Sequence, residues 1–361
     1  MEIGLFYAYQ LPDTTPSEGF EWDLQTARWA DGYGLTEAWF SEHYTVGYER
    51  WCSPELQIAA VARETTSLRL GTGANLIPYH HPVALAYRLM MLDHMTKGRL
   101  MVGFGAGGFS TDAHLFGTQM PAQNHEMLEE GQQLIRQIWA NEGEALKVAG
   151  KHFSVDIPAL EQPLHLGSHW RPYQPGGPRV AVAGFTPASS TIREGGARGD
   201  IPMSIAFTNE YLASHWAAYC EGAARTGVTP NREDWRIVRD VVVADTDEAA
   251  WELAYSEPYR RVYEEWVIPH NMPMLLKMMP GVRPEDITFE AFSQGWIVGS
   301  PETVTEALVA EQQLTGGFGK LLVHNMDFHR EPDGYRRHLE LLGTVVAPAV
   351  TERTAALFAA K

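Results

Sequence analysis

The sequence predicts an α/β fold, a (β/α)8 TIM barrel, and three observations favour it. Short apolar runs alternate with longer amphipathic stretches, and eight such runs are each followed by a helical pattern, the order typical of a barrel of parallel strands. The chain has 361 residues, 45% of them hydrophobic, which is enough for one large core. Because no repeat, low-complexity tract or linker interrupts the pattern, we expect a single domain over residues 1–361.

The eight expected strands are short runs rich in apolar residues. They are Ile3–Tyr7, Glu37–Phe40, Leu68–Ala74, Leu100–Gly103, Arg179–Ala183, Ile201–Ala206, Ile237–Ala244 and Lys320–His324. The helical patterns between them lie near residues 20–33, 54–64, 82–95, 123–140, 188–197, 209–226, 247–264 and 301–315, with a last one near 335–358.

The chain is longer than the roughly 250 residues that such a barrel needs, and the surplus falls in two segments. They are residues 141–178, rich in proline and glycine, and residues 265–298, which hold Met272, Met274, Met278 and Met279. We interpret both as insertions, after strands four and seven, on the face where barrel loops carry chemistry. The methionines would line or cover a pocket for an apolar ligand. The alternative is that both are long surface loops without a role.

Composition excludes several classes of protein. The formal charge of −17 disfavours binding to nucleic acid or to an anionic membrane surface. Cys52 and Cys220 are too few for a disulfide framework, and no metal spacing surrounds them. The N-terminus lacks the features of a secretory signal, and no stretch approaches the ~18 consecutive apolar residues of a membrane span. We therefore expect a cytoplasmic protein.

A carboxylate and an imidazole follow the second expected strand, in the stretch EAWFSEHY. Glu42 and His43 would lie at the C-terminal end of the barrel, where active sites of this fold are built. An imidazole can transfer a proton near neutral pH, and a carboxylate can accept hydrogen bonds from a cofactor or orient the imidazole. The alternative is structural: Glu42 would bind loop amides and His43 would be a core residue.

Small residues end the third expected strand, in LRLGTGANLIPYHHPV. Gly73 and Ala74 would let a flat ligand lie against the backbone, and Asn75 offers both a donor and an acceptor. The pair His80-His81 has no third ligand at metal-binding spacing, so we predict no metal site.

The stretch GFGAGG, residues 103–108, matches the G-x-G-x-x-G pattern of dinucleotide-binding folds. The expected strand precedes it, but FSTDAHLFGTQMPAQN separates it from the next apolar periodicity, and no acidic residue ends a following strand at the required spacing. We therefore reject a Rossmann fold and infer that these glycines make room for a ligand or for packed neighbours.

A third stretch, RVAVAGFTPASSTIREGG, carries a strand, a turn and the start of a helix. The hydroxyls of Thr186, Ser189 and Ser190 lie beside the free N–H groups of that helix start, which favours a phosphate-binding loop. Ordinary helix capping explains the same residues equally well. The sequence contains no G-x-S-x-G, HExxH, P-loop or CxxC pattern, so the common hydrolase, zinc-peptidase and thiol-redox mechanisms have no support.

Taken in order, these stretches resemble the bacterial luciferase-like, flavin-dependent monooxygenases. The resemblance is carried by EAWFSEHY, LRLGTGANLIPYHHPVALAYRLMMLDHMTKGRL, GFGAGG, HLFGT and GWIVGSPETV. It implies a homodimeric barrel that takes reduced FMN from a separate reductase, forms a C4a-peroxyflavin with O2 and inserts one oxygen atom into a substrate. Around SEHYTVGYERW the likeness is to enzymes that act on small hydrophobic substrates such as terpenes and cyclic ketones.

The resemblance also implies roles for individual residues. Glu42 matches the carboxylate near the isoalloxazine, and His43 matches the proton-handling histidine. Gly73-Ala74 matches a cis peptide against the flavin, and Asn75 would reach its polar edge. The loop with Thr186, Ser189 and Ser190 would hold the phosphate.

One position departs from the family pattern. Luciferase has an arginine that assists the phosphate where this chain has Ala106, next to Gly107 in the glycine-rich end of strand four. Arg179, Arg193 or backbone amides would have to replace its charge. Two other functions remain open for this barrel: hydride transfer with a deazaflavin cofactor, and flavin binding without catalysis.

Overall fold

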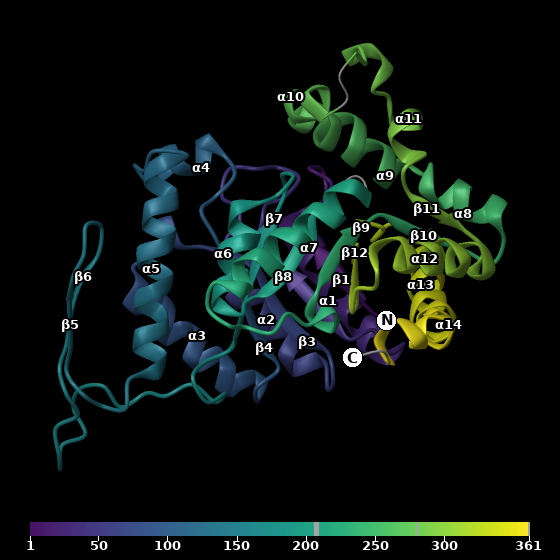
Figure 1. Ribbon diagram of the computed structural model, residues 1–361. Coiled ribbons are helices and arrows are strands. Elements are labelled where there is room, and N and C mark those ends of the chain that lie inside the picture. Colours follow the sequence, from purple (N-terminus) through teal and green to yellow (C-terminus); the bar gives the residue numbers. More distant parts are fainter. Residues whose placement is uncertain (206–208, 279–280, 360–361) are drawn as a thin grey trace. The chain divides into compact units, whose positions relative to one another are not determined.

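The predicted fold class is confirmed. The computed structural model describes residues 1–205, 209–278 and 281–359, and its eight main strands close a barrel (Figure 1). In their hydrogen-bonded order, these strands are β1 (Glu2–Tyr7), β12 (Lys320–His324), β9 (Arg236–Arg239), β8 (Ile201–Ile205), β7 (Arg179–Gly184), β4 (Leu100–Gly105), β3 (Arg69–Leu76) and β2 (Glu37–Phe40).

Helices connect successive barrel strands, and most begin at residues that favour helix starts. The Thr15 hydroxyl and the Glu18 carboxylate form a reciprocal capping box at the first helix, and proline occupies the first turn of several others. The helices are α1 (Pro16–Gly32), α2 (Pro54–Glu64), α3 (Pro82–Thr96), α4 (Ser110–Leu115), α5 (Ala122–Ala140), α6 (Ser190–Arg198), α7 (Asn209–Ala224), α8 (Asp247–Ala254), α9 (Glu257–Val262), α10 (Ile268–Met278), α11 (Phe289–Ser293), α12 (Pro301–Thr315), α13 (Pro332–Leu341) and α14 (Ala347–Ala359).

The chain forms two compact units. Unit 1 comprises Met1–Ala38, Gly47–Glu49 and Ala183–Lys361, and unit 2 comprises Trp39–Val46 and Arg50–Val182. The expectation of a single domain stays a prediction.

In unit 1, β1 pairs in parallel with β12, and β12 with β9. The side chains of Glu37 and Arg236, the first residues of β2 and β9, form a fully buried ion pair at 2.7 Å. The C-terminal ends of these strands carry three polar residues: Tyr9 after β1, Asp240 after β9 and His324 at the end of β12.

In unit 2, β3 pairs with β4, but the register shifts between Thr72 and Asn75, so that Gly73 and Ala74 both lie opposite Gly103. A Cβ atom at Gly103 would lie 2.5 Å from the Thr72 carbonyl oxygen, so only glycine fits there. The first glycine of GFGAGG therefore makes room for a bulge in the neighbouring strand.

The prediction of one strand over Ile237–Ala244 was wrong. The chain forms β9, is interrupted at Asp240, and continues as β10 (Val241–Val243), which leaves the barrel to pair with β11 (Ile297–Gly299). The apolar pattern on both sides of Asp240 resembles one strand because both halves are buried. The expected helix 247–264 is likewise divided, since Ser256 and Pro258 begin α9.

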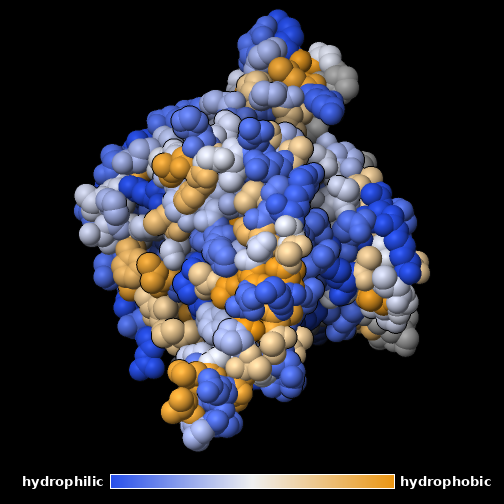
Figure 2. All heavy atoms as spheres, turned by 90° about the vertical axis from the view of Figure 1, so that its left-hand side faces the viewer, coloured by the Kyte–Doolittle hydropathy of each residue, from blue (hydrophilic) through white to orange (hydrophobic). Residues whose placement is uncertain are grey.

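The first insertion, residues 141–178, does follow β4, but its expected face was wrong. It comes after α5 and leads into β7, and it includes the hairpin β5 (Leu146–Ala149) and β6 (Ser154–Ile157). The Gln174 side chain donates to the carbonyl of Leu100, the first residue of β4, so this segment lies at the N-terminal end of that strand. Figure 2, which views the side that carries the hairpin, shows apolar patches among hydrophilic residues.

The second insertion, residues 265–298, is largely helical. A π-helical turn, Tyr263–Val267, joins α9 to α10, and Met272 and Met274 are half-buried on α10. Met278 ends that helix, and Met279 lies outside the described residues.

The C-terminal stretch Pro332–Phe358 is long and apolar enough to cross a membrane by length and composition alone. Its residues Tyr335, Leu339, Leu342 and Val346 are buried, whereas Arg336, Arg337 and Arg353 form ion pairs with acidic side chains or bind a tyrosine hydroxyl. One apolar face and one charged face are typical of a helix that packs on the core of a barrel.

Candidate active site

The carboxylate of Glu42 is the centre of a hydrogen-bond network. Glu42 lies two residues beyond β2 and is buried, with 1% of its surface exposed. One carboxylate oxygen accepts hydrogen bonds from the Tyr44 hydroxyl at 2.8 Å and from His80 Nε2 at 2.7 Å. The other accepts from the Leu76 amide at 3.1 Å and from the Asn75 side-chain amide at 3.4 Å. Four internal partners therefore satisfy a group that burial would otherwise disfavour.

Asn75 lies within β3, directly after the Gly73–Ala74 peptide, which is cis as the resemblance implied. Its side chain is fully buried. Because Glu42 binds the amide nitrogen, the orientation of the side chain is fixed, and its Oδ1 has no hydrogen-bond partner among the described residues. The site thus holds an oriented, buried acceptor that is free to receive an N–H group.

His43 is held by a residue that the sequence reasoning missed. Its Nδ1 lies 3.6 Å from Oδ2 of Asp112, a buried residue of α4. The other oxygen of Asp112 accepts hydrogen bonds from the amides of Tyr44 at 3.3 Å and Thr45 at 2.8 Å. Burial raises the pKa of Asp112, but the nearby His43 ring and the hydrogen bonds from Thr45 outweigh it and hold this pKa below its ordinary value. An ionised Asp112 can therefore orient the His43 ring through Nδ1.

His80 was weighed only as a metal ligand, but it belongs to the Glu42 network. Arg88 donates to His80 Nδ1 at 3.3 Å and to Glu55 at 3.0 Å. Since an arginine only donates, Nδ1 is the acceptor, and the ring proton is on Nε2, which faces Glu42. No group of three or more His, Cys, Asp or Glu side chains that could hold a metal ion occurs in the part of the chain that the structure describes.

Aromatic side chains border this network. Tyr79 stacks on Phe116 with ring centroids 4.6 Å apart, and Tyr44 meets Phe116 edge-on, also at 4.6 Å. Burial and the charge of Asp112 raise the pKa of Tyr79 to about 12, so its hydroxyl stays protonated at neutral pH. These rings give one side of the site an apolar wall.

The glycine-rich end of β4 lies against the same residues. Asn124 donates to the Ala106 carbonyl at 2.9 Å, and Gly107 has a positive φ of 85°. A Cβ atom at Gly107 would lie 2.5 Å from the Tyr79 hydroxyl, so a side chain there would collide with it. The short helix α4, which the sequence reasoning did not predict, begins two residues after Gly108.

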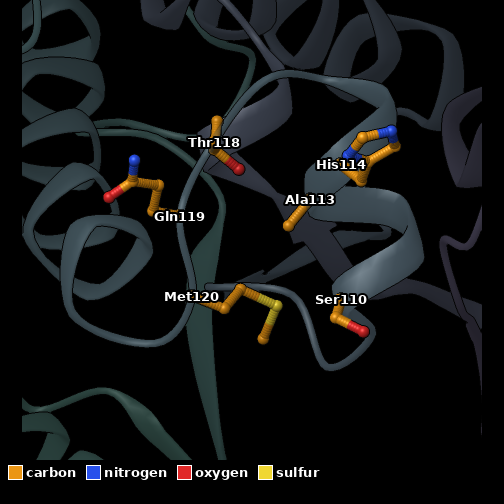
Figure 3. A pocket seen from close by; sticks show the side chains of 6 residues that line it. All are labelled: Ser110, Ala113, His114, Thr118, Gln119 and Met120. Carbon is orange, nitrogen blue, oxygen red and sulfur yellow. The ribbon is translucent and has the colours of Figure 1, made fainter.

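Two hollows lie beside α4. One, of about 430 Å³, is lined by Ser110, Ala113, His114, Thr118, Gln119 and Met120 (Figure 3). The other, of about 500 Å³, is lined by Thr45, Ser110, Thr111, His114 and Leu115. Neither is lined by Glu42, His43 or Asn75, although Thr45, which lines the second, binds Asp112 through its amide.

Thr186, Ser189 and Ser190 belong to unit 1. The Ser189 hydroxyl caps α6 by accepting from the Ile192 amide at 3.4 Å, as the capping alternative predicted. The Thr186 carbonyl accepts from Nε2 of the buried His215 at 2.8 Å, and burial lowers the pKa of His215, which favours the neutral ring. A histidine of α7 therefore fixes the start of this loop.

The structure thus brings Glu42, His43, Asn75, the Gly73–Ala74 peptide, Ala106 and Gly107 into unit 2. It adds Asp112 and His80. In the sequence, nothing distinguishes Asp112 except its place in the STDAHLFGT stretch. His80 stands out only because His81 follows it.

The chain is similar to known proteins over almost its whole length. The family model described as luciferase-like monooxygenase matches residues 1–317. The chain is 31% identical to 3,6-diketocamphane 1,6-monooxygenase of Pseudomonas putida, with 97% of this chain and 98% of that protein covered. It is 29% identical to limonene 1,2-monooxygenase of Rhodococcus erythropolis, with coverage of 96% and 86%.

The solved structures agree. The oxygenating constituent of 3,6-diketocamphane monooxygenase from Pseudomonas putida, a type II Baeyer–Villiger monooxygenase solved in complex with FMN, matches with a TM-score of 0.91 and 31% identity, covering 97% of this chain and 98% of that one. With its barrel and this match, the chain belongs to the luciferase-like monooxygenase family.

Proposed function

We propose that this chain is the oxygenase component of a two-component, FMN-dependent monooxygenase that inserts one oxygen atom from O2 into a small hydrophobic organic substrate. The observation that carries the proposal is the buried Oδ1 of Asn75, which has no partner among the described residues. An unsatisfied buried acceptor costs about 1–3 kcal/mol. The imide N–H of an isoalloxazine ring would remove that cost.

The residues around Asn75 fit a flavin ring. The bulge at Gly73 and Ala74 presents backbone without large side chains, and both residues are only half-buried. A flat heterocycle can approach such a surface closely. Asn75 would hold the polar edge of the ring, and Glu42 would act on the cofactor by orienting Asn75, since its own oxygens already have four partners.

The phosphate of FMN would be held by the loop with Thr186, Ser189 and Ser190 at the start of α6. Arg193 is the better replacement for the family arginine, because it lies on α6 and contacts the Ala188 carbonyl at 3.5 Å. Arg179 is the first residue of β7, and the loop follows the last. At roughly 3.3 Å per residue, that strand places it too far away.

His43 would handle the proton. Reduced FMN, when bound, supplies the electrons that activate O2. Asp112 lies 3.6 Å from Nδ1 of His43 and would orient the imidazole, which would give or take a proton at the reacting atoms. The T-shaped contact of the ring with Phe109, at 4.8 Å, limits water on one side of the imidazole.

The substrate class follows from the relatives. The two relatives described above are named for 3,6-diketocamphane and for limonene. Met272 and Met274 on α10 would supply adaptable apolar contacts for such compounds.

The enzyme would work with a separate NAD(P)H:flavin reductase, in the cytoplasm and as a homodimer. The adjacent helices α2 and α3 expose Leu56, Met91 and Met95, a surface that a second copy would cover.

The proposal is tested by titrating the protein with oxidised FMN and with a deazaflavin cofactor, then measuring oxygen consumption with a flavin reductase and NADH. We expect FMN to bind and oxygen consumption to yield oxygenated product. Asn75→Leu should weaken FMN binding about tenfold, whereas Asn141→Leu, at the end of α5, should not.

The outcome also separates the alternatives. Binding of the deazaflavin alone would favour hydride transfer, and FMN binding without any turnover would favour a non-catalytic flavoprotein. If neither cofactor binds, the proposed function fails.

A further inference from the structure

Two buried polar groups in unit 2, beside the glycine-rich end of β4, have no hydrogen-bond partner among the described residues. They are the Tyr79 hydroxyl and the side-chain oxygen, Oδ1, of Asn124. Tyr79 ends a short 3-10 helix, Ile77–Tyr79, that follows β3, and Asn124 lies in the first turn of α5. The two residues are only 8% and 0% exposed. Since an unsatisfied buried polar group lowers stability, two of them together indicate that a third group binds there.

The hydrogen-bonding roles of both groups are fixed. The side-chain nitrogen of Asn124 donates to the Ala106 carbonyl at 2.9 Å, and because a carbonyl only accepts, Oδ1 lies on the other side of the amide as an acceptor. Burial and the charge of Asp112 raise the pKa of Tyr79 to about 12, against the opposite effect of the Asn124 side chain. The Tyr79 hydroxyl therefore keeps its proton at neutral pH and can donate it.

The two groups are close to each other, and the backbone leaves space at the hydroxyl. The Asn124 side chain acts on the pKa of Tyr79, so the two side chains are neighbours. Gly107 has no side chain to fill the space, and a Cβ atom there would lie 2.5 Å from the Tyr79 hydroxyl oxygen. One small polar group placed at both side chains would satisfy the donor and the acceptor together.

A cavity of about 430 Å³ adjoins this pair (Figure 3). Met120, which lines the cavity, packs against the apolar cluster that contains Tyr79. The carbonyl of Gln119, another lining residue, accepts from the Asn124 amide at 3.3 Å. The Thr118 hydroxyl also lines the cavity and has no partner among the described residues. Because one water molecule takes about 30 Å³, the cavity has room for a chain of several atoms.

A hydroxyl group is the chemical group that satisfies Tyr79 and Asn124 at once. Its oxygen accepts from the Tyr79 hydroxyl, and its proton is donated to Oδ1 of Asn124. An ionised phosphate oxygen only accepts, so it would leave Oδ1 unsatisfied. The negative charge of Asp112, which already acts on Tyr79, would also repel a phosphate at this place.

We propose that Tyr79 and Asn124 bind a hydroxyl group of the ribityl chain of FMN; this inference rests on the proposed flavin-dependent function. The ribityl chain joins the isoalloxazine ring to the phosphate. Asn75, the residue proposed for the ring, pairs in register with Phe104, two residues before Ala106. The absence of an arginine at Ala106 then has a physical reason, because this end of β4 binds a neutral part of the cofactor.

The test compares three ligands that share one ring: lumiflavin, which has no ribityl chain, riboflavin, which has the chain, and FMN, which adds the phosphate. Their binding to the full-length protein is measured by fluorescence titration for the wild type, Tyr79→Phe and Asn124→Leu. Tyr87→Phe, on α3 of the same unit, is the matched control. Urea unfolding without flavin is measured in parallel.

We expect each of the two variants to weaken riboflavin and FMN binding by the same factor, about tenfold, and to leave lumiflavin binding unchanged. Tyr79→Phe removes a hydroxyl that has no partner in the flavin-free protein, so its unfolding midpoint should not fall. Tyr87→Phe should change none of the three affinities.

The three ligands separate the possible failures. A larger loss for FMN than for riboflavin would assign the pair to the phosphate, and an equal loss for lumiflavin would assign it to the ring or to the fold. Unchanged riboflavin and FMN binding in Tyr79→Phe would leave the pair to a bound water. Each of these results overturns the inference and leaves the proposed function standing. If the wild type binds none of the three flavins, the proposed function fails and the inference fails with it.

Discussion

The strand ends of the two units carry polar networks of opposite character. In unit 2, both oxygens of Glu42 are bound by protein groups, and Asp112 receives two backbone amides in addition to His43. In unit 1, His324 binds the Asp240 carboxylate at 3.0 Å and the Tyr263 hydroxyl interacts with the same group, while the side chains of Asp240 and His324 are 13% and 12% exposed. Hydrogen bonds to charged groups are worth about 1.5–3 kcal/mol each, so the first network is far more strongly held.

The difference separates two tasks. A closed network such as that of Glu42 fixes the geometry of other residues and leaves one group, Asn75 Oδ1, open toward a cofactor. A more open pair such as Asp240 and His324 has fewer protein partners and keeps part of its surface exposed. Removing a carboxylate should therefore cost more stability in unit 2 than in unit 1.

The largest effect is expected from His43→Ala. A positioned proton donor or acceptor contributes about 10²–10⁴-fold to a rate, so product formation should fall at least about 100-fold while FMN still binds. The reduced flavin would then release hydrogen peroxide instead of oxygenated product. The measurement is the ratio of product to peroxide per NADH consumed with a flavin reductase.

His81→Ala is the control for this variant, since His81 is an exposed residue at the start of α3. Asp112→Asn should give an intermediate loss, because the ring remains but its orientation is less firmly held. Unchanged turnover in His43→Ala would remove His43 from the mechanism.

The second prediction contrasts the two carboxylates directly. Glu42→Ala leaves the Leu76 amide, the Asn75 side chain and His80 without their acceptor, so the free energy of unfolding should fall by about 3–5 kcal/mol. Asp240→Ala removes a carboxylate that is bound by the His324 side chain, and the loss should be smaller, about 1.5–3 kcal/mol. Urea unfolding of both variants measures the difference. Equal losses would contradict the division into closed and open networks.

The strand ends of unit 2 were largely predictable from the sequence. EAWFSEHY and LGTGAN are local patterns, and each polar residue follows directly on an apolar or glycine-rich run. The cis peptide could be predicted only from the family resemblance. The requirement for glycine at 103 could not be predicted locally, because it depends on a bulge in the neighbouring strand.

The partners of these residues were not predictable, for a physical reason. Asp112 reaches Thr45 across 67 positions of sequence, and His324 reaches Asp240 across 84. Asp240 in particular stood inside an apolar pattern that indicated one continuous strand, and only the nonlocal pairing of β10 with β11 shows that the chain turns away there. Periodicity reports which face a residue occupies, and not which distant residue it meets.

A buried histidine of unit 1 gives the third prediction. His338 accepts a hydrogen bond from the Val243 amide at 3.0 Å, and burial lowers its pKa to about 4. Between pH 6.5 and 4 the unfolded chain binds a proton that the folded one excludes, so stability rises with pH through this window and is lost as the pH falls. At about 1.4 kcal/mol per pKa unit, the loss is on the order of 3 kcal/mol.

Thermal unfolding across this pH range measures the effect. His338→Asn keeps an acceptor for the Val243 amide but does not titrate, so its stability should depend less on pH than that of the wild type. An identical pH dependence in both proteins would assign the effect to other groups, among them His215, whose pKa is also lowered by burial.

The smallest effect is expected at the outer end of the closed network. Arg88 links His80 to Glu55, but its side chain is 46% exposed, and exposed ion pairs contribute roughly 0–1 kcal/mol. Arg88→Met should therefore change the free energy of unfolding by less than about 1 kcal/mol and FMN affinity by less than about twofold, because Glu42 alone keeps the His80 proton on Nε2. Flavin titration and urea unfolding measure both quantities. Arg88→Met would contradict the prediction if it weakened FMN binding as much as Asn75→Leu does. That result would show that the orientation of Asn75 depends on the Arg88–Glu55 pair at the surface.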